Sequence, residues 1–440
     1  MIKSTFEEAH TQQWIHQNIP NRTHDLVILR QVIPWARIIK RLVRFYDADK
    51  GRFGTSLRIL IAILIVAKLR KLSDRQVVAQ VQENRYIQYF CNVPDEELQT
   101  FLNDSTICTF RKRIGEAGSA IIEAEAFDHL RRCGVIQADT CLIDASVLSN
   151  NLIYPNDVQL VFKAFGKMAT FAKTHSLPLW WDHDEVKKHW RAFGLNKKQD
   201  RAAYLLQFHL LFVPALETFW QQVEALDASA QDKPKAQNLA DLLRLLHMQT
   251  LEKIAGEKHI KDRIVSLDEV DARPIKRGKR YPACEFGTTL QMSFNRQGFM
   301  ITTENFIGAQ SEKTLYPTTF EQFQNRMKGD PDTVVTDLGC RSAKNLRLTK
   351  AAVTNVFMGR TDDVSPDQQD FCKSARSATE GFIAVAKNLR GFGWSLYRGL
   401  SGDRIWTLLC QAAFNLKKFL QLYRAEDIEE ESLMKLGLLG

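Results

Sequence analysis

Residues 333–339 read T-V-V-T-D-L-G, and this short stretch decides the fold. The β-branched run predicts a buried strand that ends at Asp337. Downstream, residues 376–387 read R-S-A-T-E-G-F-I-A-V-A-K and predict a helix. At about 100° per residue, Arg376, Glu380 and Lys387 lie within roughly 40° of one another on that helix. A carboxylate between two cations, close to a second carboxylate at a strand end, suits a metal ion that holds a phosphodiester.

A second strand, residues 140–147 with the sequence T-C-L-I-D-A-S-V, is expected to end at Asp144. If the two strands are neighbours and the helix packs across their ends, Asp144, Asp337 and Glu380 converge on one point. Carboxylate oxygens suit Mg²⁺ or Mn²⁺, and two such ions about 4 Å apart would serve an in-line displacement at phosphorus. The ordinary alternative for Glu380 is an exposed i, i+4 salt bridge with Arg376. Arg376 and Lys387, with Arg341 and Lys344 after Asp337, are candidate phosphate contacts.

The remaining patterns predict a mixed α/β layer structure interrupted by helices. Further strands are expected at residues 263–268, 285–294, 298–306 and 353–359. Helices are expected at 312–327, from Ser342, and at about 368–389 and 403–423. A long helical region, about residues 157–262, separates the first strand from the others.

The N-terminal part is helical in pattern, with helices expected at 57–69, from Ser73, and from Asp104. Such short capped helices could form a helix-turn-helix-like bundle. The last helix carries Arg111, Lys112 and Arg113, which could meet a DNA backbone or could simply solvate the bundle. A basic loop from Arg273 to Arg280, which includes Lys276 and Arg277, is expected as an exposed hairpin that touches phosphate, with a solvated loop as the equal alternative.

Composition is that of a globular protein: 440 residues, 45% hydrophobic, with a formal charge of +9 that fits a polyanion partner. The eight cysteines form no C-x-x-C pair and are interpreted as buried free thiols of a reducing compartment. The N-terminus lacks an apolar signal region, and residues 59–69 are too short to span a bilayer. We therefore expect a cytoplasmic protein with no membrane partner.

At these residues the chain resembles bacterial insertion-sequence transposases of the DDE type, in the insertion-sequence-five-like group whose last carboxylate lies in a Y-(2)-R-(3)-E-(6)-K signature. Arg376, Glu380 and Lys387 match R-(3)-E-(6)-K, whereas Lys373 occupies the tyrosine position. The D-x-G-x-R-S-x-K-N element is present at residues 337–345, with Leu338 at a position that is often polar or Gly. L-I-D-A-S-V before Y-P-N-D, L-S-D-R-Q-V-V and the C-terminal helices are also similar, so the resemblance covers roughly residues 40–425.

The resemblance implies an RNase H-like mixed sheet flanked by helices, with a helical insertion after the first strand and an all-helical N-terminal DNA-binding domain. The corresponding ranges are 1–135 for the N-terminal domain, 136–156 and 263–425 for the catalytic domain, 157–262 for the insertion and 426–440 for a tail. Asp144, Asp337 and Glu380 would bind two Mg²⁺ or Mn²⁺ ions. Lys373 lies on the same helical face as Arg376 and could contact a phosphate.

The implied activity is cleavage of double-stranded DNA at the terminal inverted repeats of a mobile element, followed by joining of the 3′-hydroxyl to target DNA. Such an enzyme would be a homo-oligomer, with a dimer favoured, and would be associated with the bacterial nucleoid. Two alternatives remain open: a catalytically silent, transposase-derived DNA-binding protein, and an RNase H-like nuclease that cuts without joining.

Overall fold

The structure, a computed structural model, describes residues 8–47, 54–98, 103–153, 155–195, 201–227, 232–276, 284–359 and 365–439. The chain divides into two compact units. The first unit comprises Met1–Ser149, Thr289–Phe306 and Gln310–Gly440, and the second comprises Asn150–Thr288 and Ile307–Ala309. The boundaries proposed above for an N-terminal domain, an insertion and a tail stay predictions.

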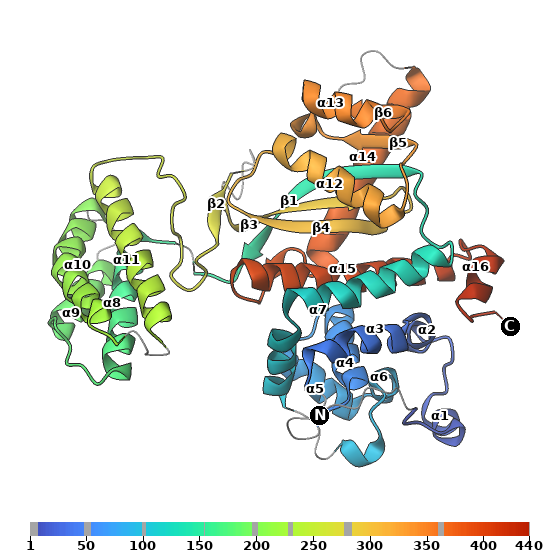
Figure 1. The fold of residues 1–440 in the computed structure, drawn as a ribbon, viewed down its shortest axis with the longest axis horizontal. Coiled ribbons are helices and arrows are strands. Elements are labelled where there is room, and N and C mark those ends of the chain that lie inside the picture. Colours follow the sequence, from blue (N-terminus) through green and yellow to red (C-terminus); the bar gives the residue numbers. More distant parts are fainter. Residues whose placement is uncertain are drawn as a thin grey trace. The chain divides into compact units, whose positions relative to one another are not determined.

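A mixed sheet forms the centre of the first unit, and the predicted α/β class is confirmed (Figure 1). Its strands are β1 (Thr140–Asn150), β3 (Glu285–Phe294), β4 (Met300–Ile307), β5 (Thr333–Thr336), β6 (Asn355–Met358) and β7 (Trp394–Ser395). The neighbours run β3-β1-β5-β6, while β4 pairs with β3 and β7 pairs with β1. β1, β5 and β6 are parallel, and β3 and β4 are antiparallel.

β1 is longer than the sequence predicts, so the expectation that it ends at Asp144 was wrong. The parallel ladder with β5 covers only Thr140 to Ile143, but β1 continues to Asn150. It continues because β3 borders it and because β7 takes over the edge that β5 leaves; the Ser149 amide donates to the Gly393 carbonyl. Asp144 therefore lies inside β1, at the point where its parallel neighbour ends.

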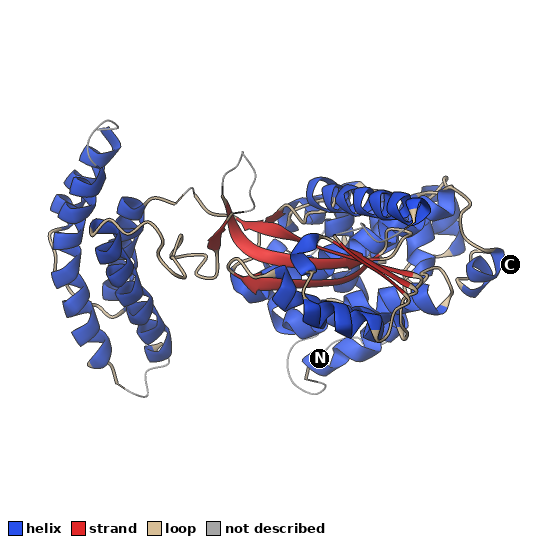
Figure 2. Ribbon diagram, turned by 90° about the horizontal axis from the view of Figure 1, so that it is seen from above, coloured by secondary structure: helices blue, strands red, loops and turns tan. Residues whose placement is uncertain are grey.

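Helices cover both faces of this sheet (Figure 2). They are α12 (Glu312–Met327), α13 (Ala343–Lys350), α14 (Pro366–Leu389) and α15 (Gly399–Arg424), followed by the short α16 (Glu430–Lys435). Side chains alternate between faces along a strand. Cys141 and Ile143 accordingly pack in a core with Tyr316 and Phe320 of α12, whereas Leu142 packs in another with residues of α14 and α15.

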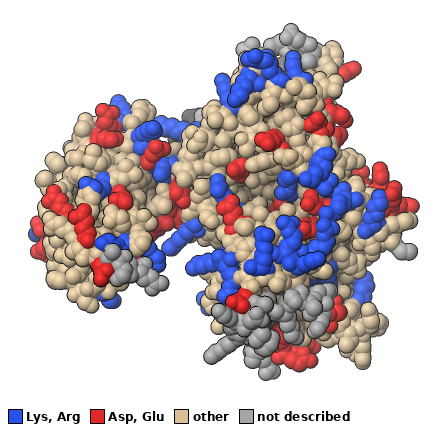
Figure 3. Space-filling view, viewed as in Figure 1, with Lys and Arg blue, Asp and Glu red and all other residues tan. Residues whose placement is uncertain are grey.

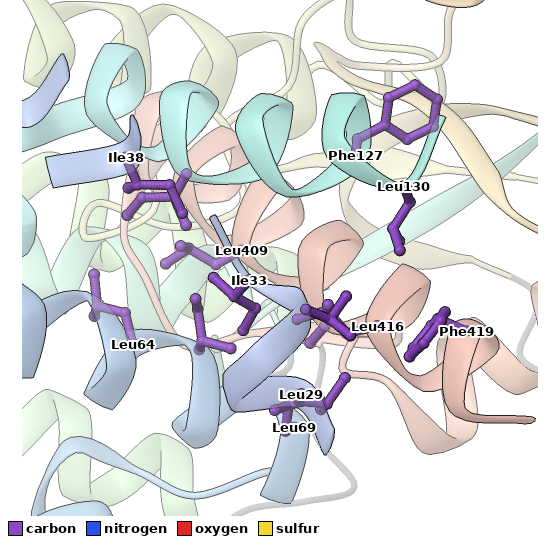
Figure 4. Close-up of a cluster of buried hydrophobic side chains, with 14 of the residues drawn as sticks. Leu29, Ile33, Ile38, Leu64, Leu69, Phe127, Leu130, Leu409, Leu416 and Phe419 are labelled. Carbon is purple, nitrogen blue, oxygen red and sulfur yellow. The ribbon is translucent and has the colours of Figure 1, made fainter. Parts of the chain in front are cut away.

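Helices make up the N-terminal part of the first unit. They are α1 (Gln12–Asn18), α2 (Asp25–Val32), α3 (Trp35–Leu42), α4 (Leu57–Arg70), α5 (Asp74–Glu83), α6 (Arg85–Cys91) and α7 (Asp104–Arg132), with 3₁₀ turns at Val43–Phe45 and Asp95–Glu97. The helices predicted from residue 57, Ser73 and Asp104 are confirmed. α7 runs beyond the predicted basic end, through a break at Gly115, whose φ is 57°. Residues of α2, α4, α7 and α15 share one hydrophobic core (Figure 4).

The second unit is helical, with α8 (Asp157–Thr174), α9 (His183–Leu195), α10 (Arg201–Glu224) and α11 (Lys233–Ile254) around its own hydrophobic core. α10 is long and apolar enough to cross a membrane by length and composition alone, and it packs against α8 and α11. A short strand β2 (Arg273–Ile275) pairs antiparallel with Glu285–Gly287.

The strand predicted at residues 263–268 is absent. These residues lie against the helices instead of a neighbouring strand. Ile264 and Leu267 are buried in the helical core, and the Ile264 amide donates to the Gln249 side chain at 2.9 Å. An apolar run with β-branched residues can thus be buried without any ladder partner.

Candidate active site

Two aspartates stand at matched positions on neighbouring parallel strands. Ile143 of β1 pairs with Thr336 of β5, and Asp144 and Asp337 are the next residues of each. Adjacent strands lie about 4.8 Å apart, so the two backbones are still close at this point. The sequence prediction that these two residues lie together is met by the sheet register.

The alternation of side chains along β1 and β5 places both aspartates on the sheet face that α14 covers. Leu142 and Val335, two residues before Asp144 and Asp337, pack in one core with Cys372 of α14. Side chains two residues apart on a strand share a face. Asp144 and Asp337 therefore project toward the face of the sheet where α14 lies.

α14 carries the third carboxylate. A capping box at Ser365 and a proline at the first helical position fix its start. Its buried stripe consists of Cys372, Ala375, Thr379 and Ala386. Arg376 and Glu380 directly follow two of these positions and are exposed. Together with Asp144 and Asp337 they line a cavity of about 20 Å³.

The Arg376 guanidinium donates from Nη2 to Oδ1 of Asp337 at 2.5 Å. Both side chains are nearly half exposed, at 45% and 47%. Asp144 accepts a hydrogen bond at Oδ1 from the amide of Ala145, at 2.6 Å. In this state the cavity contains three carboxylates and one cation, and the cation is bound to a carboxylate.

Residues 337–345 form a hydrogen-bonded turn after β5. The chain makes a 3₁₀ turn over Leu338–Cys340, then starts α13 with the Ser342 hydroxyl accepting from the Asn345 amide. The buried Asn345 side chain donates to the carbonyls of Cys340 and Lys313, at 2.8 and 2.9 Å. These hydrogen bonds hold the turn against the start of α12, and with it the position of Asp337.

A fourth carboxylate, which the sequence reasoning missed, approaches this turn. A side chain at Gly339 would place its Cβ 2.2 Å from Oε2 of Glu312, so the glycine leaves room for that carboxylate. Burial, then the charge of Glu312 and, less strongly, those of Asp144 and Asp337 together raise the pKa of the Cys340 thiol to about 12, against a hydrogen bond with Thr336 that lowers it. Negative potential is therefore concentrated at this end of the sheet. No local sequence pattern predicts that Glu312 lies near this turn, because Glu312 belongs to α12.

The donor set has the chemistry of a hard divalent cation site, since it consists of carboxylate oxygens. Its geometry is not that of a closed metal site: across the described parts of the chain, no group of three or more His, Cys, Asp or Glu side chains is arranged to hold a metal ion. The Arg376–Asp337 ion pair accounts for part of this difference, because one ligand oxygen is engaged by a guanidinium. An ion bound by all three carboxylates would compete with Arg376 for Oδ1 of Asp337.

The other predicted phosphate contacts are spread over the first unit. Lys387 does not reach the carboxylate cavity and lines a separate one. Lys373 is exposed and lies 3.4 Å from Asp370, although it lines a small cavity of about 60 Å³ beside Arg376. Arg341 donates to the Met358 carbonyl at 3.3 Å, and Lys344 is exposed on α13.

The basic residues of α7 that were predicted to contact DNA differ in their exposure to solvent. Arg111 is bound within the protein: it pairs with Asp74 at 2.9 Å, lies 3.9 Å from the Tyr397 ring centroid, and its side chain is only 12% exposed. Lys112 and Arg113 are exposed. In the second unit Lys276, directly after β2, is exposed, whereas Arg277 lies outside the residues that the structure describes.

A further group of cations was missed by the sequence reasoning. Arg37, Lys40 and Arg41 of α3 are exposed, as is Arg44 in the 3₁₀ turn that follows. Arg37 and Arg41 both pair with the buried Glu125 of α7. Lys and Arg side chains gather over α7 and around α13 on the face seen in Figure 3. The i, i+3, i+4 spacing of the α3 cations could have indicated this surface.

Comparisons with known proteins found one matching family and one similar protein. Residues 13–113, which include α1 to α6 and the start of α7, match a family described as Transposase domain (DUF772). The chain is also 29% identical over 164 residues to "Uncharacterized protein ORF8 in nfe locus" of Rhizobium meliloti, which covers 37% of this chain and 79% of that relative. No solved structure matches. The two matches support a transposase family and a function related to transposition.

Proposed function

We propose that this protein is a DDE-type DNA transposase with an RNase H-like catalytic core. It would bind the terminal inverted repeats of an insertion sequence, cleave the DNA ends and join the freed 3′-hydroxyl to target DNA. The observation that carries the proposal is the shared cavity of Asp144, Asp337, Glu380 and Arg376. It unites three carboxylates from distant parts of the chain in a protein whose N-terminal region matches a transposase family.

Asp144, Asp337 and Glu380 would hold Mg²⁺ or Mn²⁺, and two ions are expected from the chemistry. When bound, divalent cations lower the pKa of the attacking hydroxyl or water and neutralise charge at the scissile phosphate. The chain contributes the placement. The parallel register of β1 and β5 fixes Asp144 and Asp337. The turn that Asn345 holds also fixes Asp337.

Arg376 has a separate role in this proposal. Its guanidinium lies in the carboxylate cavity, and a guanidinium binds phosphate oxygens in a bidentate manner. We expect it to exchange Asp337 for a phosphate of the bound DNA. Lys373, nearby on α14, would contact a neighbouring phosphate.

The exposed cations of α3 and α7 would bind the DNA backbone, together with Lys344 and Lys276. Contacts of this kind fix register and affinity without reading sequence. Lys387 and Arg341 remain candidate contacts by resemblance, while Arg111 would act inside the protein by joining α5 and α7. We further propose a homo-oligomer, with a dimer favoured, because two ends of the mobile element must be paired. We also propose that the protein acts in the bacterial cytoplasm.

The test is a cleavage and strand-transfer assay on DNA that carries the sequences flanking the gene, with Mg²⁺. We expect Asp144→Ala, Asp337→Ala and Glu380→Ala each to abolish cleavage while retaining end binding in a gel-shift assay. Asp367→Asn is the matched control, since this exposed carboxylate lies on the same helix as Glu380. It should cleave like the wild type.

The outcomes separate the alternatives. Cleavage followed by joining supports a transposase. Cleavage without joining indicates a nuclease, and binding alone indicates a silent DNA-binding protein. Persistent cleavage by the Asp337→Ala variant would refute the site assignment.

A further inference from the structure

A second cavity of the first unit, of about 330 Å³, is separate from the carboxylate site. Its walls come from the end of α4, the start of α5, the end of α14 with the segment around β7, and α15. The volume lies within the usual range for small-molecule sites, of roughly 300–1,000 Å³. Its lining holds none of Asp144, Asp337 and Glu380, so it needs an explanation of its own.

The charges of this cavity are of one sign. The described lining includes these charged residues and no carboxylate: Lys68, Lys71, Lys387 and Arg390. The Lys71 ammonium donates to the Asn388 carbonyl at 2.9 Å, which ties the turn after α4 to the end of α14. Like charges around one cavity repel one another, and an anion between them would relieve that repulsion.

Lys68 is the unusual member. Its side chain is buried, at 8% exposure, with Nζ 3.0 Å from the Trp406 ring centroid and 4.5 Å from that of Tyr397. It forms no salt bridge within the part of the chain that the structure describes. A buried ammonium held only by aromatic rings is poorly compensated, because cation–π attraction is worth about 2 kcal/mol when desolvated.

Burial lowers the pKa of Lys68 to about 7. This value includes the charge of Cys410, which raises the pKa, that of Arg111, which lowers it, and that of Asp74, which raises it. Lys71, Lys387 and Arg390 share the cavity with it and add positive charge. Near neutral pH the ammonium is therefore only part protonated, and an anion bound beside it would favour the protonated form.

The rest of the wall is apolar and partly flat. Leu72, Leu396 and Trp406 line it, and Trp394 is 55% exposed at its side. An exposed indole offers a stacking surface to a planar group. The cavity thus combines a positively charged part with a flat apolar part.

We propose that this cavity binds a nucleoside monophosphate, with the phosphate among Lys68, Lys71 and Arg390 and the base against Trp394. The nucleotide could be free or could be part of a DNA strand, since the recognised chemistry is the same. The proposal does not depend on the carboxylate site. A ligand here would join α4 and α5, within the family-matched region, to α14, which carries Glu380.

The experiment is isothermal titration of the full chain with dAMP, with inorganic phosphate and deoxyadenosine as the two halves of the ligand. We expect dAMP to bind at least tenfold more tightly than either half. Above pH 7, titration in buffers of different ionisation enthalpy should report uptake of up to about one proton per ligand, taken by Lys68.

Variants assign the binding to this cavity. Lys68→Met should weaken dAMP binding about tenfold or more and abolish proton uptake. Arg390→Gln should weaken binding while proton uptake remains, which keeps the test valid if the first variant does not fold. Lys350→Gln, an exposed cation on α13 outside the cavity, should behave like the wild type.

A 5′-phosphorylated single-stranded oligonucleotide distinguishes the sources. Binding of the strand but not of dAMP, with the same dependence on Lys68, would assign the cavity to DNA, and binding of dAMP would support a free nucleotide. Failure of both, or equal affinity of the wild type and Lys68→Met, would overturn the proposal. Glu380→Gln should bind dAMP normally, so this result and that of the cleavage assay are independent.

Discussion

Arg376 and Asp337 form an ion pair, with Nη2 of the arginine 2.5 Å from Oδ1 of the aspartate. The arginine thus occupies an oxygen that a divalent ion would use. Since both side chains are nearly half exposed, the pair is worth less than about 1 kcal/mol. It is strong enough to compete with an ion and weak enough to be exchanged.

Replacing Arg376 by Gln should therefore raise the affinity for Mn²⁺, by up to about fivefold, because Asp337 no longer has a competing partner. Affinity for DNA should fall at the same time, because a phosphate contact is lost. Electron paramagnetic resonance titration of free Mn²⁺ measures the first effect. Lys373→Gln, one helical turn away and paired with Asp370, is the control for metal binding. Unchanged Mn²⁺ affinity in a folded Arg376→Gln protein would contradict the competition.

Asn345→Ala should lower the free energy of unfolding by about 2–4 kcal/mol, because the carbonyls of Cys340 and Lys313 lose a buried donor. Chemical denaturation followed by circular dichroism measures the loss. The adjacent Lys344→Ala changes an exposed side chain and should cost less than about 0.5 kcal/mol. Equal stability of the two variants would show that Asn345 does not hold the turn.

Gly359→Ala tests the support of the same turn from β6. Gly359 has a φ of +74°, and an added Cβ would lie 2.5 Å from Cα of Leu338, next to Asp337. We expect a loss of about 1–3 kcal/mol in stability and a displaced turn that reduces cleavage. Gly329→Ala, where an added Cβ meets nothing within 4 Å, should be close to neutral. A stable, fully active Gly359→Ala protein would argue against this support.

Lys68 should make stability depend on pH in a direction set by its burial. Its pKa is about 7 in the folded protein against a reference of 10.5, so the unfolded chain binds more protons between these values. Stability should then rise as pH increases from about 7 to 10.5, by up to about 1.4 kcal/mol per pH unit, and should lack this contribution below pH 7. The measurement is the difference between the unfolding curves of the wild type and Lys68→Met at several pH values. If the stabilities of the two proteins changed with pH in parallel, Lys68 would not have a lowered pKa in the folded protein.

The sequence predicted that three carboxylates lie together on the condition that their two strands are neighbours. The end of each strand run is a local signal, whereas the pairing of β1 with β5 is not. Asp144 and Asp337 follow runs of buried strand residues, and Glu380 follows the buried stripe of α14. The position of Lys387 was not predictable in this way. Its angle around the helix agrees with Glu380, but seven residues of helical rise place it about 10 Å further along the axis, where it lines another cavity.

Other features depended on partners that a linear pattern does not reveal. Arg111 is part of a basic run, yet Asp74 and Tyr397 enclose it. Ile264 lies in a run of strand-forming residues, yet its amide is bound by the Gln249 side chain of α11. In each case the prediction was wrong because the residue's partner comes from a distant part of the chain.

The order of strands has one more consequence. β1 and β3 are neighbours in the sheet, although more than a hundred residues of helical chain connect them. In topological terms the helical segment is a connection between two strands, β1 and β3, that are neighbours in the sheet. A change in the length of this segment would leave intact the strand register that sets Asp144 beside Asp337, because β1 and β5 pair outside it.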